Sequence, residues 1–74
     1  MSSYVIIGCG RFGSAVAKTI YSLGHEVLAI DMNMEIIQDI ADHVTQAVQA
    51  DATDEATLKS LGIRNYDVAV ISVA

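Results

Sequence analysis

The hydrophobic positions of this chain alternate between short continuous apolar runs and stretches in which apolar residues recur every three or four positions. Short runs rich in Val and Ile are typical of strands buried on both faces, and the longer period is typical of amphipathic helices. Strands are predicted over residues 3–7, 26–31, 45–50 and 67–73, and helices over about 12–23, after Asn33 and from Thr53 to about Leu61. Strands that alternate with helices predict an α/β fold with a parallel sheet.

The ends of the predicted helices carry residues that are typical of caps. Gly24 and Gly62 follow the first and third helices, where glycine frequently forms the C-terminal cap. Asn33 and Thr53 precede the second and third helices, where a side-chain oxygen can accept a hydrogen bond from a free backbone N–H. The apolar residues at helical spacing along the first helix are Phe12, Val16, Ile20 and Leu23.

The order of strands in the sheet follows from the handedness of the connections. Parallel crossovers are right-handed in nearly all cases, so the strand order is 3-2-1-4 if the fourth strand returns beside the first. Ligands bind such sheets at the topological switch point, which here lies where the first strand ends. Because the last buried strand coincides with the end of the chain, we expect residues 1–74 to form a single domain that is a fragment of a longer protein, truncated after strand four.

The first strand leads into the turn Gly8-Cys9-Gly10-Arg11-Phe12-Gly13. This G-x-G-x-x-G pattern between a strand and a helix is the dinucleotide-binding fingerprint of the Rossmann fold. In that fold the first glycine permits the tight turn, the second lets the backbone approach a pyrophosphate, and the third lets the helix pack closely. The free N–H groups at the start of the helix then face the phosphates. The motif alone fits a simple tight turn equally well, but its position favours nucleotide binding.

Three side chains are candidates for the rest of the nucleotide. Asp31 ends the second strand at about the spacing from Gly13 that the fingerprint requires, and its carboxylate can accept both ribose hydroxyls. It would repel a 2′-phosphate, so NADP is disfavoured; alternatively, Asp31 caps the second helix, and the two roles are compatible. Arg11 can reach phosphate oxygens with its planar guanidinium or remain solvated. Asp51 follows the third strand and either accepts a bond from the adenine amino group or caps the third helix.

Other reactive side chains indicate no catalytic or metal chemistry. Cys9 is interpreted as a small side chain in a crowded turn, and His25 and His43 as surface residues. The sequence shows no nucleophile–base pair, no carboxylate pair suited to acid–base work and no metal-ligand spacing. We therefore expect a binding domain that is not an enzyme.

Composition and charge exclude several classes of partner. The net charge is −5 with four basic residues in 74, so the chain lacks the basic cluster that nucleic-acid binding requires. No apolar run approaches the roughly 20 residues that span a bilayer, and no signal peptide is recognised. One cysteine excludes an internal disulfide and fits a reducing cytoplasm. Since a chain this short buries only about 60% of its unfolded surface, we expect a partner surface or further sequence to stabilise it.

Four segments together resemble a known family, and they cover nearly the whole chain. They are the glycine turn 8–13, the segment 24–31, the stretch Ala50-Asp51-Ala52-Thr53 and the run 61–67, Leu-Gly-Ile-Arg-Asn-Tyr-Asp. The chain resembles the N-terminal half of RCK (KTN) domains, which occur in the regulatory subunits of Trk/Ktr-type potassium uptake systems. Among these it is most similar to the Ktr-type regulatory subunit.

The resemblance implies a function that composition does not show. Such domains bind NAD(H) or ATP/ADP, form dimers that assemble into rings, and lie in the cytoplasm, peripheral to the cell membrane, beneath a membrane potassium-translocating subunit. Nucleotide exchange changes the shape of the ring and so gates ion flow. Carried over to this sequence, the cofactor-binding residues are Gly8, Gly10, Arg11, Phe12 and Gly13 at the phosphates, Asp31 at the ribose and Asp51 near the base.

Two other functions share parts of this pattern. The alternative is the N-terminal cofactor-binding piece of an NAD-dependent oxidoreductase. Hydride transfer also needs a nicotinamide pocket and an acid–base residue, and the sequence shows neither. A methyltransferase that uses S-adenosylmethionine has a comparable turn and acid, but its turn is usually looser. NAD(H) and ATP/ADP present the same adenosine and diphosphate to these residues, so the sequence leaves that choice open.

Overall fold

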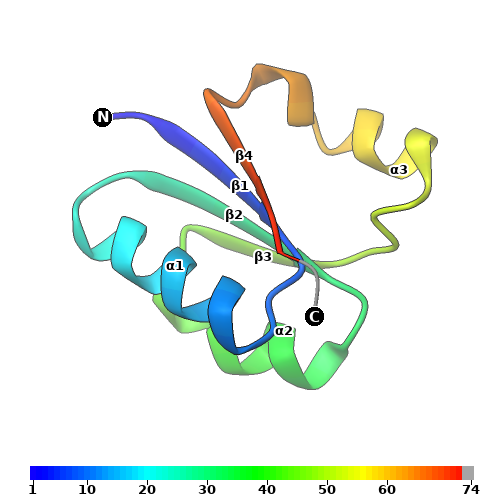
Figure 1. The fold of residues 1–74 in the computed structure, drawn as a ribbon. Coiled ribbons are helices and arrows are strands. Elements are labelled where there is room, and N and C mark those ends of the chain that lie inside the picture. The colour runs from blue at the N-terminus through cyan, green and yellow to red at the C-terminus, as the bar shows by residue number, and fades with distance from the viewer. Residues whose placement is uncertain (73–74) are drawn as a thin grey trace.

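The computed structural model describes residues 1–72 and shows a four-stranded parallel sheet with helices on both faces (Figure 1). The strands are β1 (Ser3–Ile7), β2 (Glu26–Asp31), β3 (Gln46–Gln49) and β4 (Val68–Ile71). The α-helices are α1 (Arg11–Ser22), α2 (Met34–Ile40) and α3 (Glu55–Ser60). Short 3₁₀ helices lie at Ala41–His43 and Ile63–Asn65. The strand order is β3-β2-β1-β4, which confirms the predicted order and the Rossmann-like fold. The part of the predicted fourth strand that includes Val73 lies outside the described residues.

The two central strands form the core of the molecule. Val5 pairs with Leu28 and Ile6 with Ala29 in parallel register. Because successive side chains of a strand point to opposite faces of the sheet, these strands supply two separate apolar clusters. One contains Ile6, Cys9, Ala17, Val27, Ala29, Ile40 and Val44, and the other contains Val5, Leu28 and Ile30 with Leu58, Leu61, Ile63 and Tyr66 packed against them. The continuous apolar runs in the sequence therefore mark strands that are covered on both sides.

The helices divide between the two faces of the sheet. α1 and α2 contribute to the first cluster through Ala17 and Ile40, and α3 contributes to the second through Leu58. Figure 1 shows α1 and α2 together on one side of the sheet and α3 on the other. Since every strand is parallel, the carboxyl ends of all the strands meet at one edge, where the glycine turn lies.

Helix α1 packs on the sheet through small residues as well as through some of its large apolar ones. Phe12 and Leu23 are each 70% exposed, and Val16 and Ile20 are half-buried. The buried residues of this helix are Gly13 and Ala17. The helix lies close to the sheet at these small residues. Val16 and Ile20 pack against the first cluster beside them, whereas Phe12 and Leu23 lie outside it.

The predicted caps of α1 and α2 and the glycine that follows α3 are confirmed, but the predicted N-terminal cap of α3 is wrong. Gly24 and Gly62 adopt φ of +94° and +70° after α1 and α3, and Asn33 caps α2 by accepting from the Glu35 N–H at 2.9 Å. The N-cap of α3 is Asp54, which accepts from the N–H of Ala56 at 3.0 Å, and not Thr53 as predicted. The Thr53 hydroxyl instead donates to Asp51, at 2.6 Å.

One histidine also differs from the prediction. His43 is exposed as expected, whereas His25 is half-buried. The Nδ1 atom of His25 accepts from the Ser2 N–H at 3.1 Å, and its ring lies against Tyr4 with centroids 5.3 Å apart. His25 therefore has a structural role at the start of the central strands, and its interpretation as a surface residue is wrong.

Candidate functional site

Two glycines of the turn are required by the fold itself. Gly8 has φ of +86°, and a Cβ atom at this position would lie 2.2 Å from the carbonyl oxygen of Ser72. A Cβ atom at Gly13 would lie 2.1 Å from the carbonyl oxygen of Gly8. Both distances are far shorter than any real Cβ contact, so a side chain at either position would force β1, β4 and α1 apart.

Gly10 is different, because neither its backbone nor its surroundings require glycine. Its φ of −61° and ψ of −166° are open to other residues. Apart from Gly10 itself and its neighbours in the chain, no atom of the described residues lies within 4 Å of the position that its Cβ would occupy. Glycine costs conformational entropy on folding, so its presence here is not explained by the packing of this domain.

The N-terminus of α1 differs from those of the other two helices in lacking a side-chain cap. Gly10 is its N-cap residue, and no acidic residue lies in its first turn. The α2 and α3 helices are capped by the side chains of Asn33 and Asp54. The first N–H groups of a helix have no partner inside the helix, and together with the positive end of its dipole they favour an anion. The N-terminus of α1 is therefore suited to hold phosphate oxygens beside Gly10.

Asp31 joins the glycine turn to the start of the α2 segment. Its Oδ2 atom accepts from the Cys9 N–H at 2.7 Å, and its Oδ1 atom accepts from the Asn33 N–H at 2.8 Å. The carboxylate is half-buried. Asn33 is the N-cap of α2, so the alternative in which Asp31 itself caps that helix is wrong.

Cys9 is buried beneath the turn, as its interpretation as a small side chain in a crowded position predicts. It is 1% exposed, and its Sγ lies 3.5 Å from the carbonyl oxygen of Ile30. Burial raises the pKa of the thiol to about 11, and the charge of Asp31 adds to this, against the opposing effect of the Ile30 carbonyl contact. The thiol is therefore protonated at neutral pH and is a poor nucleophile.

Asp51 lies at the same edge of the sheet, one strand farther from the turn. The N–H of Ala50 donates to the carbonyl oxygen of Asp31 at 3.0 Å, which places the ends of β2 and β3 side by side. The Oδ1 atom of Asp51 accepts from both the N–H and the hydroxyl of Thr53, at 2.9 and 2.6 Å. These bonds lower the pKa of the exposed Asp51 carboxyl. Asp51 thus shapes the turn that precedes α3, and Asp54 caps that helix.

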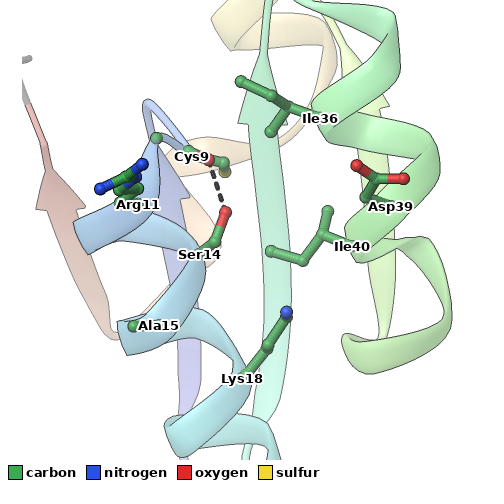
Figure 2. A pocket seen from close by; sticks show the side chains of 9 residues that line it. Cys9, Arg11, Ser14, Ala15, Lys18, Ile36, Asp39 and Ile40 are labelled. Atoms are coloured by element: carbon green, nitrogen blue, oxygen red, sulfur yellow. Dashed lines mark hydrogen bonds between the residues drawn. The ribbon is translucent and has the colours of Figure 1, made fainter.

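A cleft of about 510 Å³ opens between α1 and α2 next to the glycine turn. It is lined by Cys9, Gly10, Arg11, Ser14, Ala15, Lys18, Ile36, Asp39 and Ile40. Figure 2 shows Lys18 of α1 and Ile40 of α2 extending into the gap between the two helices. Asp31 and Asp51 are not among its lining residues, so the structure divides the predicted site between the carboxyl edge of the sheet and this cleft.

On the α1 side of the cleft, sequence reasoning identified Gly10 and Arg11 but missed Ser14 and Lys18. The Ser14 hydroxyl donates to the Cys9 carbonyl oxygen and so closes the turn from within the helix. Lys18 follows Arg11 by about two helical turns, which places both cations on one side of α1. That spacing was present in the sequence and could have identified Lys18.

The described residues contain no group of three His, Cys, Asp or Glu side chains that could hold a metal ion. Within the same residues, no helix has the length and apolar character needed to cross a membrane.

Two solved structures of similar fold belong to proteins that were determined with a bound adenine nucleotide. One is N5-carboxyaminoimidazole synthetase from Staphylococcus aureus, solved in complex with ADP. The match covers 96% of this chain and 18% of the synthetase, with a TM-score of 0.78 and 25% identity. The Kef C-terminal domain of Shewanella denitrificans, solved in an AMP-bound form, matches 96% of this chain and 42% of its own length, with a TM-score of 0.76 and 24% identity. The second similarity is one of fold alone.

Sequence comparison identifies the family. Residues 4–74 match the family model of the TrkA-N domain. The chain is 44% identical over 70 residues to the Ktr system potassium uptake protein A of Bacillus subtilis, covering 95% of this chain and 32% of that protein. It is 41% identical over 64 residues to a Trk system potassium uptake protein TrkA homolog of Pyrococcus abyssi, covering 85% of this chain and 28% of that protein. The chain thus spans about a third of the length of these relatives. Because the family model covers nearly all of it, the chain belongs to the TrkA-N domain family.

Proposed function

We propose that this chain is the nucleotide-binding part of a cytoplasmic regulatory subunit that binds NAD(H) or ATP/ADP and gates a membrane potassium-translocating subunit. In this proposal the domain performs no catalysis. It associates with further copies of itself as a dimer and a ring, and it reaches the membrane only through its partner. Its relatives are components of Ktr and Trk potassium uptake systems, which supports both the process and the membrane partner.

The observation that carries the proposal is the unexplained glycine at position 10. The conformation of Gly10 is ordinary, and apart from Gly10 and its neighbours in the chain no described atom lies within 4 Å of the position that its Cβ would occupy. A diphosphate resting against the uncapped start of α1 would fill that space and would exclude a methyl group from it. The synthetase of similar fold, of which 18% matches this chain, was solved with ADP, a ligand of the class proposed here.

Asp31 has acceptor capacity left for a ribose. An ionised carboxylate offers about four lone-pair sites, and the N–H groups of Cys9 and Asn33 use one on each oxygen. The remaining sites can accept the two ribose hydroxyls, whereas a 2′-phosphate would meet a negative charge at close range. Asp51 uses Oδ1 for Thr53, and its Oδ2 is the atom we assign to the adenine amino group.

For regulation, one nucleotide must favour one conformation of the protein more strongly than another nucleotide does. A ligand shifts a conformational equilibrium only by the difference between its affinities for the two conformations. Adenosine is common to ATP and ADP, so the phosphates must supply the difference between these two ligands. The exposed guanidinium of Arg11, beside the start of α1, is the side chain that we assign to this discrimination, with Phe12 flanking the phosphates.

Titration calorimetry with NAD, NADH, ATP, ADP and NADP tests the binding site through two glycine variants. Gly10→Ala should keep the stability of the wild type and weaken nucleotide binding by about tenfold or more, equivalent to about 1.4 kcal/mol, because its methyl group occupies the phosphate position. Gly24→Ala is the matched control: its added methyl also enters open space, but its φ of +94° makes the change destabilising. It should lower stability and leave affinity intact. Equal nucleotide affinities for Gly10→Ala and wild type would refute the proposed site.

The assignment of Arg11 is tested in the same way. Arg11→Ala should weaken ATP binding more than adenosine binding, because the guanidinium contacts only phosphate oxygens in this proposal. Lys59→Ala removes an exposed cation from α3, on the other face of the sheet, and serves as the control. Equal losses for ATP and adenosine would argue against a phosphate role for Arg11.

The regulatory role requires a transport measurement with the intact gene product. Potassium uptake by cells that carry Gly10→Ala should no longer respond to changes in the nucleotide pool, while the amount of the protein is unchanged. An uptake response equal to that of the wild type would separate potassium transport from nucleotide binding and refute the gating proposal.

A further inference from the structure

We infer that Asp31 is a positioning residue for the phosphate-binding turn as well as a ribose ligand, so that phosphate affinity depends on a carboxylate that does not touch phosphate. The inference rests on the proposed nucleotide site, which it deepens. Its basis is the contact between the Asp31 carboxylate and the Cys9 N–H in the middle of the glycine turn.

The turn is held against the end of β2 by successive backbone amides. The N–H of Gly8 donates to the carbonyl oxygen of Ile30 at 2.9 Å, which continues the pairing of β1 with β2. The next N–H, that of Cys9, donates to the Asp31 side chain at 2.7 Å. The Cys9 side chain points into the same region, with its Sγ 3.5 Å from the Ile30 carbonyl oxygen. The carboxylate therefore supplies the acceptor at the point where regular strand pairing ends.

The charge and the rigidity of the carboxylate both matter for this role. A bond from an N–H to an ionised acceptor is shorter and about twice as strong as one to a neutral acceptor. Cys9 lies between Gly8 and Gly10, the residues with the greatest backbone freedom in the turn. The other oxygen of Asp31 accepts from the Asn33 N–H at 2.8 Å, so the side chain is held from two sides.

Removal of the carboxylate would leave the Cys9 amide without this partner. A buried N–H that loses its acceptor destabilises the fold by the full penalty of its desolvation. The turn would therefore shift so that water can reach this N–H. The N–H groups at the start of α1 would then no longer be preorganised for the diphosphate, and preorganisation is a major source of affinity. A ribose-only role for Asp31 would have no such effect on a ligand that lacks ribose.

Inorganic pyrophosphate and adenosine separate the two roles. In calorimetric titrations, Asp31→Ala should weaken the binding of both, with a loss of about fivefold or more for pyrophosphate. Asp67→Ala is the control, because the Asp67 carboxylate also accepts a backbone N–H, that of Ser3, but at the opposite end of the sheet. It should leave both affinities unchanged. Pyrophosphate affinity that is equal in Asp31→Ala and the wild type would overturn the inference.

A measurement without any ligand keeps the inference testable if pyrophosphate fails to bind. Cys9 is the one cysteine of the chain and is 1% exposed, so labelling by iodoacetamide at pH 8 reports on this turn. Asp31→Ala should accelerate labelling several-fold, because the turn opens and a negative charge is removed from beside the thiol. Asp67→Ala controls for a general loss of stability. If labelling of Asp31→Ala is no faster than that of Asp67→Ala, the inference is wrong, whatever the outcome of the nucleotide titrations.

Discussion

Ser3 and Asp67 join the starts of β1 and β4 by reciprocal hydrogen bonds. The Ser3 N–H donates to Asp67 Oδ2 at 2.8 Å, and the Asp67 N–H donates to Ser3 Oγ at 3.1 Å. The two residues are 64 positions apart in the sequence. They lie just before Tyr4 and Val68, the first residues that pair β1 with β4, and thus stabilise the start of that pairing, at the end of the sheet opposite the glycine turn.

The Ser3–Asp67 pair should contribute measurably to stability although it is exposed. Asp67→Ala should lower the free energy of unfolding by about 1 kcal/mol, the usual net value of such bonds. Urea denaturation of Asp67→Ala, Ser3→Ala and the double variant measures the coupling between the two residues, with Asp42→Ala as an exposed control. Strictly additive losses would show that the two side chains do not interact in solution.

Gly13 and Gly10 should respond to the same substitution in opposite ways. Gly13→Ala should destabilise the domain by roughly 2–3 kcal/mol or more, because the new Cβ would lie 2.1 Å from the backbone oxygen of Gly8. Gly10→Ala should change stability by less than about 0.5 kcal/mol, since its Cβ meets no described atom within 4 Å apart from those of its neighbours in the chain. Urea denaturation of both variants measures the difference. Similar stabilities for the two would contradict the close packing of α1 on the turn.

The stability of the domain should fall in alkaline solution because of Cys9. The pKa of its thiol is raised from 9.0 to about 11 in the folded state, so the unfolded state loses its proton first as the pH rises. The resulting stabilisation, about 2–3 kcal/mol, is complete below pH 9 and is lost as the pH rises toward 11. The difference in unfolding free energy between wild type and Cys9→Ala isolates this effect from other titrating groups. A difference that stays constant between pH 8 and 11 would contradict the burial of the thiol.

The low pKa of Asp51 should depend on Thr53. The Thr53 hydroxyl and N–H both donate to Oδ1 of Asp51 and favour its ionised form. Thr53→Val removes the hydroxyl donor, so the Asp51 pKa should rise toward the ordinary value of 3.8, as followed by NMR titration of the carboxyl carbon. Thr53→Ser keeps the hydroxyl and should keep the low pKa. An unchanged pKa in Thr53→Val would show that the hydroxyl bond is absent in solution.

The sequence alone determined the strands, their order and the location of the turn. The apolar runs at β1 and β2 are local patterns, and the right-handed crossover rule then leaves few topologies open. Gly8, Gly13, Gly24 and Gly62 were also identified from sequence, because tight turns and helix ends use glycine for local conformational reasons. The cap of α3 was misassigned because Thr53 and Asp54 are both good cap residues, and the bond from Thr53 to Asp51 decides between them.

The tertiary structure alone decided how the site is assembled. The bond between Asp31 and Cys9, the burial of Gly13 and Ala17 in place of Phe12, and the cleft between α1 and α2 all require segments that are distant in the sequence. Helical periodicity describes one helix at a time and does not say how closely that helix approaches the sheet. That distance is set by the contact between Gly13 and the Gly8 carbonyl, which forms only when α1 packs back on the strand that precedes it.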